Sequence, residues 1–283
     1  MSKSKRAFLP PVRWAPEELR IWTVEEDGLP YGVSVILPVY NAERYVAEAV
    51  HSVFAQRYFH GGMQVVAVDD GSTDGSPEVL RELQREYGDA MVVIPQPNRG
   101  AAAARNLAMR RATGRYYMFQ DADDVSPATR LKTCLQALED YECDVVYGQK
   151  ETFLRSTDVR GWHPPASQAG PGNIHSGCGF GTGALFMRAD KALWLDESMA
   201  GAEDHELLIA MLAEGRKVQC LKDTVLYRRD VDGSLRHQVD WTLARHWAFL
   251  KHRAFLEHYT GKRLPVFAEQ EAAVMAARKA AGW

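Results

Sequence analysis

The chain has 283 residues, of which 46% are hydrophobic and 25% charged, and its formal net charge is −3. These values are typical of a folded globular protein with a substantial core, and they exclude a highly charged disordered chain. The near-neutral balance disfavours nucleic acid as a partner, because no overall basic field is present, although a local basic patch is compatible with it.

The four cysteines are scattered without the spacing of metal ligands, and the amino terminus lacks the pattern of a secretory signal. No stretch approaches the roughly 18 apolar residues needed to cross a bilayer. We therefore expect free thiols and a cytoplasmic protein. Basic residues at 251–253 and 262–263 leave the inner face of a membrane as a second place of action, although a solvated basic face explains them equally well.

The first half of the chain alternates between two periodicities. Residues 1–31 are rich in proline and are expected to form an arm that packs on the body. Apolar runs predict buried strands at residues 33–39, 64–69, 91–94 and 115–120. Spacing of three and four residues predicts helices at residues 42–56 and 77–87, the first capped by Asn41, and a run of strong helix formers predicts a helix at 101–112. This alternation indicates an α/β fold with a mostly parallel sheet.

The second half is less regular. The patterns predict a helix at residues 127–141, a strand at 144–149 and a long loop at 155–181. A strand at 182–188, a helix at 203–214 and a strand pair at 217–229, broken near Asp223, are expected to follow. From residue 240 onward the spacing predicts terminal helices.

An aromatic strand at residues 115–120 ends in three carboxylates, Asp121, Asp123 and Asp124. In parallel sheets, ligands bind beyond the carboxyl ends of the strands. Three such charges on one turn repel one another by roughly a kcal/mol per close pair unless a cation is bound. Mg²⁺ and Mn²⁺ prefer carboxylate and phosphate oxygens, so the turn predicts a divalent metal with a phosphorylated ligand. A solvated turn with one capping Asp is the alternative.

Polar residues with candidate roles lie elsewhere along the chain. Asp70 follows a strand and suits a hydrogen bond from a nucleobase N–H, or a plain helix-entry turn. Arg105 can reach a diphosphate, or can be solvated on its helix. Glu203 and Asp204 open a helix, where the helix dipole favours acids, and one of them is a candidate general base. Alternating glycines at 177–183 predict a flexible lip beside the site.

Taken together, these motifs resemble the family-2 glycosyltransferases, which have the glycosyltransferase-A fold. The resemblance rests on Pro38-Val39-Tyr40-Asn41, on the Asp69–Asp74 turn, on Asn98-Arg99-Gly100 with Ala104-Arg105-Asn106, and on Asp121-Ala122-Asp123-Asp124. Glu203-Asp204 and Tyr227-Arg228 with Gly233-Ser234 extend it over residues 32–236. Accordingly, we expect residues 1–31 to be an extension, 32–236 the catalytic domain and 237–283 a helical segment.

The resemblance implies an inverting transfer of a sugar from a nucleotide-diphosphate sugar, with a UDP-sugar as the leading donor. It implies that Asp204 is the general base, supported by Glu203. Asp123 would hold the metal, Mn²⁺ or Mg²⁺, with Asp121 serving the ribose and the metal. The implied donor-binding residues are Pro38, Tyr40, Asn41, Asp70, Arg99, Arg105, Asp121 and Ala122.

One departure concerns a His that members of the family often carry as a metal ligand or diphosphate contact. Asp230 stands at that position here, and Asp230, Asp232 or His237 is the candidate to replace the His as a further metal ligand, unless the role is absent. Tyr227-Arg228 precedes it as in the family.

Two other functions fit parts of the sequence. A phosphotransferase of the haloacid-dehalogenase type also places Asp-x-Asp at a strand end, although normally after its first strand. A non-catalytic module that binds nucleotide sugars would need no base. The acceptor, whether glycan, lipid-linked or small molecule, is not encoded in a motif, and a homo-oligomer stays open. Trp241, His246, Trp247 and His252 are candidate acceptor contacts or packing residues.

Overall fold

The computed structural model describes residues 32–56, 62–153, 159–162, 181–199, 201–229 and 247–253, together with residues 255, 258 and 276. The predicted arm, most of the 155–181 loop and most of the terminal helices lie outside this part, as do Asp230, Asp232 and His237. Trp241 and His246 also lie outside it. The predicted domain boundaries therefore stay predictions.

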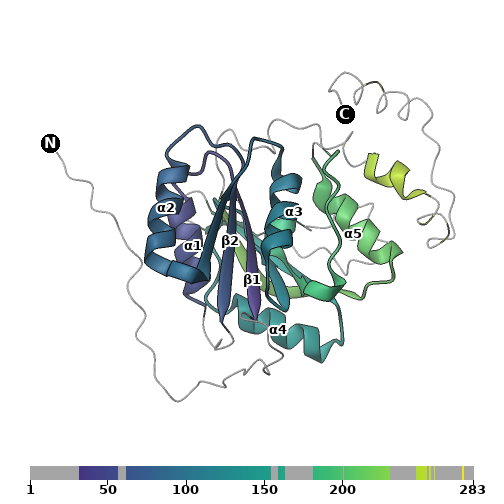
Figure 1. Cartoon of the computed structure of the whole chain (residues 1–283). Coiled ribbons are helices and arrows are strands. Elements are labelled where there is room, and N and C mark those ends of the chain that lie inside the picture. Colours follow the sequence, from purple (N-terminus) through teal and green to yellow (C-terminus); the bar gives the residue numbers. More distant parts are fainter. Residues whose placement is uncertain are drawn as a thin grey trace, which may run out of the picture.

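The described part is built around one mixed sheet, ordered β3-β2-β1-β4-β7-β5-β6 with β8 paired to β5 (Figure 1). Pairing is parallel along β3-β2-β1-β4 and between β5 and β8, whereas β7 runs antiparallel to both β4 and β5. The strands are β1 (Val33–Val39), β2 (Met63–Asp69), β3 (Met91–Pro95), β4 (Tyr116–Phe119), β5 (Val145–Phe153), β6 (Val159–Trp162), β7 (Leu185–Arg188) and β8 (Val218–Arg229).

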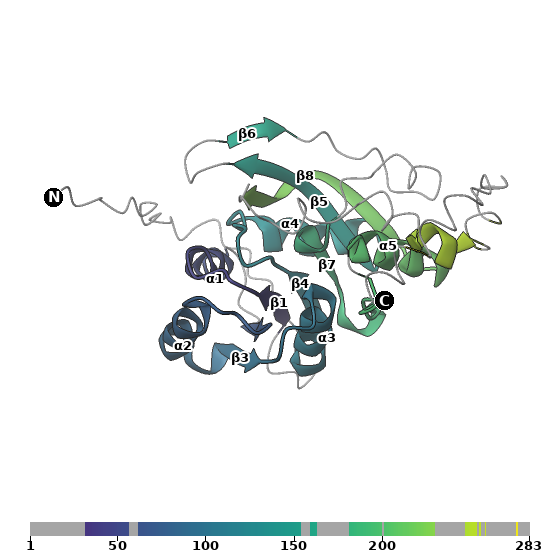
Figure 2. The same ribbon diagram turned by 90° about the horizontal axis from the view of Figure 1, so that it is seen from above.

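Helices cover both faces of the sheet. The helices α1 (Val46–Phe54), α2 (Ser76–Tyr87) and α4 (Arg130–Asp140) pack into one buried cluster, and α3 (Ala101–Arg111) and α5 (Glu203–Ala213) into another (Figure 2). On β1, Val35 and Leu37 face the first cluster and Ile36 faces the second. Burial on both faces explains why this strand is a continuous apolar run, and the α/β fold predicted from the sequence is confirmed.

The predicted cap of the first helix is wrong. The helix α1 begins at Val46, and Asn41 instead adopts a left-handed conformation with φ of 49°. Asparagine tolerates this conformation because its short amide can bond to nearby backbone. Its Oδ1 accepts a hydrogen bond from the backbone N–H of Thr73 at 2.8 Å, so Asn41 fastens the turn after β2.

Other differences fall in the second half. β8 is one strand of 12 residues rather than a broken pair, and Val159–Trp162, inside the predicted loop, forms the edge strand β6. A 3₁₀ turn, η4 (Thr182–Ala184), precedes β7. The pairing of β5 with β8 slips in register around Gln149, and this irregularity is what the sequence pattern near Asp223 reflected. Within the described residues, every helix is too short or too polar to cross a membrane.

Candidate active site

The ends of three neighbouring strands carry the candidate residues to one edge of the sheet. The carbonyl of Val39 accepts a hydrogen bond from the N–H of Asp70 at 2.8 Å, and that of Ile36 accepts one from the N–H of Gln120 at 3.1 Å. Pro38, Asp69 and Phe119 are the last or nearly last residues of their strands. Tyr40, Asp70 and the acidic turn therefore leave the sheet side by side, as parallel strands require.

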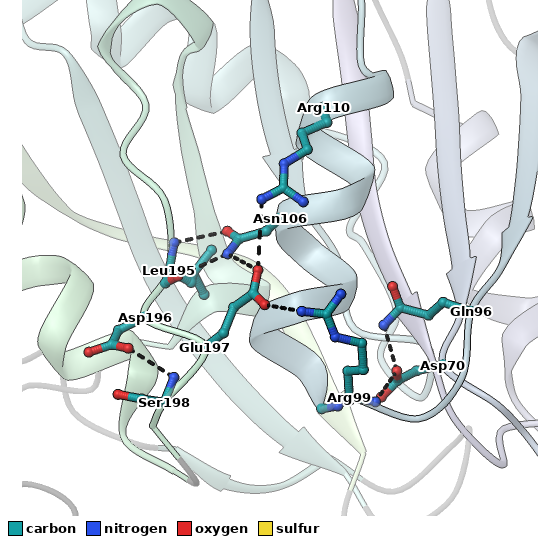
Figure 3. Close-up of polar contacts among 10 residues, drawn as sticks. Asp70, Gln96, Arg99, Asn106, Arg110, Leu195, Asp196, Glu197 and Ser198 are labelled. Atoms are coloured by element: carbon teal, nitrogen blue, oxygen red, sulfur yellow. Dashed lines mark hydrogen bonds and ion pairs between the residues drawn. The ribbon is translucent and has the colours of Figure 1, made fainter. Parts of the chain in front are cut away.

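Asp70 anchors the loop that leads into α3. Its carboxylate accepts hydrogen bonds from Gln96 Nε2 at 2.6 Å and from the backbone N–H groups of Arg99 at 2.8 Å and Gly100 at 2.9 Å (Figure 3). An ionised carboxylate has about four acceptor positions, so one position on Oδ2 stays available. The carboxylate is buried, and much of its hydrogen-bonding capacity serves the fold.

The turn after β2 lies against this loop. Gly71 has φ of +73°, and a Cβ added there would lie 2.8 Å from the backbone nitrogen of Asn98. Only glycine allows both the conformation and the close approach. Beside the turn, the ring of Tyr40 is 52% exposed, so it is accessible to a ligand.

The buried side-chain amide of Gln120 stabilises the acidic turn. Gln120 Nε2 donates to the carbonyls of Asp121 at 3.1 Å and Asp124 at 2.9 Å. From β8, the backbone N–H of Arg229 donates to Asp124 Oδ1 at 2.8 Å. Asp124 therefore fastens β8 to the turn, and Ala122 between the acids is buried.

Burial and the closeness of the three carboxylates raise the pKa of two acids in this turn. Burial, and then the charge of Asp121, raises the pKa of Asp123 to about 6. The pKa of Asp124 is also raised well above its ordinary value by burial and by its two neighbours. Among the described residues, no side chain donates a hydrogen bond to the Asp123 carboxylate, and no three His, Cys, Asp or Glu side chains cluster as metal ligands.

Arg105 joins the acidic turn to α5. Its guanidinium is buried, and it donates from Nη2 to Asp121 Oδ1 at 2.8 Å and from Nη1 to Glu203 Oε1 at 3.0 Å. Burial opposes the charged guanidinium, but the charges of Asp121 and Glu203 outweigh this effect and raise the pKa of Arg105. Burial also raises the pKa of Glu203, against the attraction of Arg105. Arg105 therefore links two acidic side chains through ion pairs.

The first turn of α5 presents Glu203 and Asp204 to the site. Asp204 Oδ1 accepts a hydrogen bond from the backbone N–H of His205 at 2.7 Å. One turn further, buried Glu206 pairs with Lys251 and, at 2.9 Å, with His252 Nε2. The described part of the terminal segment thus holds α5 in place, and His252 is a packing contact rather than a free acceptor-binding group.

Arg99 reaches away from Asp70. Its guanidinium Nη2 donates to Glu197 Oε2 at 2.8 Å, and Glu197 also accepts from Asn106 Nδ2 at 3.0 Å (Figure 3). Asn106 exchanges a pair of 2.9 Å hydrogen bonds with the backbone of Leu195. The loop that leads into α3 and the segment before α5 are therefore connected through α3.

Arg130 has a structural role that the sequence patterns did not identify. It is fully buried and donates to the carbonyls of Phe119 at 2.7 Å and Gly183 at 2.8 Å, and to Gln120 Oε1 at 3.0 Å. It thereby joins the end of β4, the acidic turn and η4. A basic residue on the apolar stripe that includes Leu131 was the available signal.

The described end of the glycine-rich stretch touches the acids. A Cβ on Gly183 would lie 2.5 Å from Asp121 Oδ2, and one on Gly181 would lie 3.8 Å from Asp204 Oδ2. The glycine at position 183 therefore leaves room for the Asp121 carboxylate, whereas the glycine at position 181 leaves room for the Lys150 ammonium. Gly177 and Gly179 lie outside the described residues.

Comparison with known proteins identifies the family. The model of the family described as glycosyl transferase family 2 matches residues 34–194. The chain therefore belongs to this family, which favours the family-2 reading of its motifs over the phosphotransferase alternative. EpsE of Bacillus subtilis, named a putative glycosyltransferase, is 29% identical over 218 residues, which are 75% of this chain and 78% of that protein.

Other relatives match over shorter regions. TuaG of Bacillus subtilis, named for putative teichuronic acid biosynthesis, is 40% identical over 111 residues, or 39% of this chain and 43% of that protein. Glycosyltransferase GlyA of Streptococcus pneumoniae is 33% identical over 131 residues, or 46% of this chain but only 18% of that protein. The match thus covers less than half the length of these two relatives.

Solved structures share the fold. Staphylococcus aureus TarS 1–349 in complex with UDP-GlcNAc aligns with a TM-score of 0.63 at 21% identity, over 77% of this chain and 66% of that one. Mannosyltransferase PcManGT of Pyrobaculum calidifontis, in complex with GDP-Man and Mn²⁺, aligns with a TM-score of 0.57 at 21% identity, over 87% and 70%. The chain therefore has the glycosyltransferase-A fold.

Proposed function

We propose that this glycosyltransferase moves a sugar from a nucleotide-diphosphate sugar, with a UDP-sugar as the leading donor, to an acceptor hydroxyl with inversion at the anomeric carbon. The observation that carries the proposal is the pair of ion pairs made by Arg105. One buried guanidinium bonds to Asp121 and Glu203, and so places the acidic turn beside the start of α5. A single displacement needs charge stabilisation at the leaving group and a base near the acceptor in one site.

The donor base would lie over the ends of β1 and β2. The exposed ring of Tyr40 suits stacking, and the remaining acceptor position of Asp70 suits a base N–H. Pro38 and Asn41 shape the floor, and Asp121 would meet the ribose. TarS is seen with UDP-GlcNAc and PcManGT with GDP-Man, so uracil and guanine are both donor bases to test.

A divalent cation, Mn²⁺ or Mg²⁺, would be held by Asp123 with Asp121 beside it. Support comes from the raised pKa of Asp123 and from the lack of a donor to its carboxylate among the described residues. Asp230 or His237 is the proposed further ligand. When bound, the cation would neutralise negative charge on the diphosphate.

In the proposed step, the acceptor hydroxyl oxygen attacks the anomeric carbon, and the bond from that carbon to the diphosphate oxygen breaks. The electron pair leaves with the nucleoside diphosphate, and the hydroxyl proton passes to Asp204. Glu203 serves this step indirectly, because its bond to Arg105 fixes the first turn of α5. One displacement inverts the configuration of the sugar.

The first experiment identifies the donor. Thermal unfolding would be followed with uridine, guanosine and adenosine diphosphates and with their sugars, each with and without Mn²⁺. We expect one base to stabilise the protein, and to do so more strongly with Mn²⁺. A protein that no nucleoside diphosphate stabilises would contradict the proposal.

The second experiment tests the base and the stereochemistry. Asp204→Asn should lower kcat by about 10³-fold and leave nucleoside diphosphate affinity unchanged, because the amide cannot accept the proton. Asp190→Asn, at an exposed position, is the matched control. The anomeric configuration of the product, read by NMR, should be opposite to that of the donor. Retained configuration would rule out the single displacement. Unchanged turnover in Asp204→Asn would rule out Asp204 as the general base.

The acceptor is proposed only as a class. Relatives named for teichuronic acid and minor teichoic acid biosynthesis make polymeric and lipid-linked saccharides the first acceptors to test, with small molecules after them. The place of action would be the cytoplasm or the inner face of a membrane. Residues 32–236 are the proposed catalytic domain.

A further inference from the structure

The basic side chains around the acidic turn differ in whether they form ion pairs. Arg105 is paired with Asp121 and Glu203, and Arg229 with Glu48. Lys150, on β5, stands apart: within the described residues its ammonium makes no hydrogen bond and no ion pair. An ammonium carries three donors, so this group has its full hydrogen-bonding capacity available.

Lys150 lies inside the site. A Cβ on Gly181 would overlap Lys150 Nζ and would lie 3.8 Å from Asp204 Oδ2, so the ammonium and the proposed base flank the same point. Lys150 is paired in register with Leu226, whose side chain and Asp121 both lie beside Gly183. Lys150 therefore occupies the space between α5 and the acidic turn.

The backbone of β5 explains why this side chain is directed to the site. The pairing of β5 with β8 slips in register between Tyr147 and Lys150. Such irregularities redirect side chains and are common next to active sites. Here the slip comes directly before Lys150.

The surroundings of Lys150 are costly for a charge without a direct partner. Burial lowers the pKa of the ammonium, and nearby Arg228 lowers it further, whereas Asp204, Asp121 and Asp124 raise it. Lys150 is only partly exposed, and a charge in such surroundings is best satisfied by a hydrogen-bonded partner. An anionic ligand would supply one, and a neutral acceptor hydroxyl would not.

We propose that Lys150 is a catalytic residue of this transferase, whose ammonium donates hydrogen bonds to the departing diphosphate of the donor. This inference rests on the proposed function. As the bond between the anomeric carbon and the diphosphate oxygen breaks, the electron pair stays on that oxygen, and Lys150 stabilises the new charge without giving up its proton. Arg105, the sequence-based candidate for this role, is committed to two carboxylates.

The test compares Lys150→Met with Lys150→Arg, and Lys222→Met on exposed β8 surface is the matched control. Binding of UDP, UMP and uridine, or of the corresponding series for the base that the donor screen identifies, would be measured by calorimetry with Mn²⁺. We expect Lys150→Met to weaken binding of the diphosphate at least 10-fold and of the monophosphate and nucleoside less than 2-fold. Its kcat should fall about 10²- to 10³-fold, as when one oxyanion donor is removed. Lys150→Arg should recover part of both losses.

Three results would decide against the inference. Unchanged diphosphate affinity and kcat in Lys150→Met would overturn it. Unchanged diphosphate affinity with a displaced acidic limb of the pH–rate profile would also overturn it, because Lys150 would then act on Asp204. Equal losses of affinity for all three nucleosides and nucleotides would indicate a structural role and overturn it as well. If the wild-type protein bound no nucleoside diphosphate, the proposed function itself would fail. If Lys150→Met does not fold, the same comparison with Lys150→Gln decides.

Discussion

The two halves of the site are held together by different means. The donor half, at the ends of β1 and β2, is fixed by strand pairing and by backbone N–H groups that donate to Asp70. The half that includes α5 and the end of β8 is fixed by side chains far apart in sequence. Arg105 and Glu203 are 98 residues apart, and Arg229 and Glu48 are 181 residues apart.

This difference has a functional meaning. Backbone pairing holds the strands of the donor half, and only a few side chains, those of Asn41 and Asp70 with the glycine at position 71, fix the loops around them. The other half depends on a few buried charges, each of which is costly to leave unpaired. Substitutions of the charges that are paired there should affect the rate of transfer and stability more than nucleotide affinity. Three variants test this and a fourth, at Asp123, tests the unpaired acidic turn, from the largest expected effect to the smallest.

The largest effect is expected for Arg130→Met. Arg130 bonds to Phe119 at the end of β4, next to the donor half, and to Gly183 in η4, and its removal leaves buried carbonyls without a partner. We expect the free energy of unfolding to fall by about 4 kcal/mol, measured by urea denaturation. Gln136→Met, exposed on the same helix, should change it by less than about 0.5 kcal/mol. A small effect of Arg130→Met would mean that the halves are joined by other contacts.

Arg105→Met should lower the free energy of unfolding somewhat less, by about 3 kcal/mol. The side chain of Asp121 is 32% exposed and can be hydrated once it is unpaired. Turnover should fall, since Glu203 no longer fixes the first turn of α5. Diphosphate affinity should change less than kcat. Calorimetry and steady-state kinetics separate the two, with Arg110→Met, 54% exposed on the same helix, as the control. An affinity loss as large as the rate loss would place Arg105 on the donor instead.

Asp123→Asn should stabilise the ligand-free protein while abolishing metal-dependent donor binding. The folded-state pKa of Asp123 is about 6, above the ordinary value of 3.8, so its ionisation costs stability as pH rises from about 4 to about 6. The amide removes this cost. The variant should match the wild type near pH 4 and exceed it by roughly 2 kcal/mol at pH 8, by urea denaturation at both pH values.

The control for this variant is Asp190→Asn, whose carboxylate is exposed. It should show no such pH-dependent gain. If Asp123→Asn were equally stable or less stable at pH 8, carboxylate crowding would not explain the acidic turn.

The smallest effect is expected for Glu197→Gln. The carboxylate pairs with Arg99 and Asn106, and the pair with Arg99 is largely exposed, so the loss should be about 1 kcal/mol or less. Because Glu197 precedes α5, we expect KM for the acceptor to rise several-fold with nucleotide affinity unchanged. Glu214→Gln, exposed at the other end of α5, is the control. A loss of nucleotide affinity would show that Arg99 acts on the donor through this pair.

Much of the fold followed from local patterns. All residues of 33–39 except Ser34 are apolar because both faces of β1 are covered, and the helices at 76–87 and 101–111 keep their predicted limits within one residue. The prediction failed where tertiary pairing overrode local signals. Asn41 bonds to the turn after β2 instead of capping α1, and β8 continues past Asp223 because β5 pairs with it on both sides of the register slip.

The candidate site divides in the same way. Asp70, the acidic turn and Glu203-Asp204 were identified from their places at strand and helix ends. The partners of these acids were not, because a partner 98 or 105 residues away leaves no local pattern. Arg130 and Lys150 were missed for this reason, and Arg105, predicted to contact the diphosphate, instead links two acidic side chains through ion pairs.

By itself, the sequence determined the α/β layout, the edge of the sheet that carries the acids, and the family to which the chain belongs. These depend on period, turn residues and short motifs, which are local properties of the chain. Only the tertiary structure decided which charges are paired and which are available. Pairing depends on which side chains meet across the fold, and that is why Arg105 is occupied by Asp121 and Glu203 while the ammonium of Lys150 makes no ion pair within the described residues.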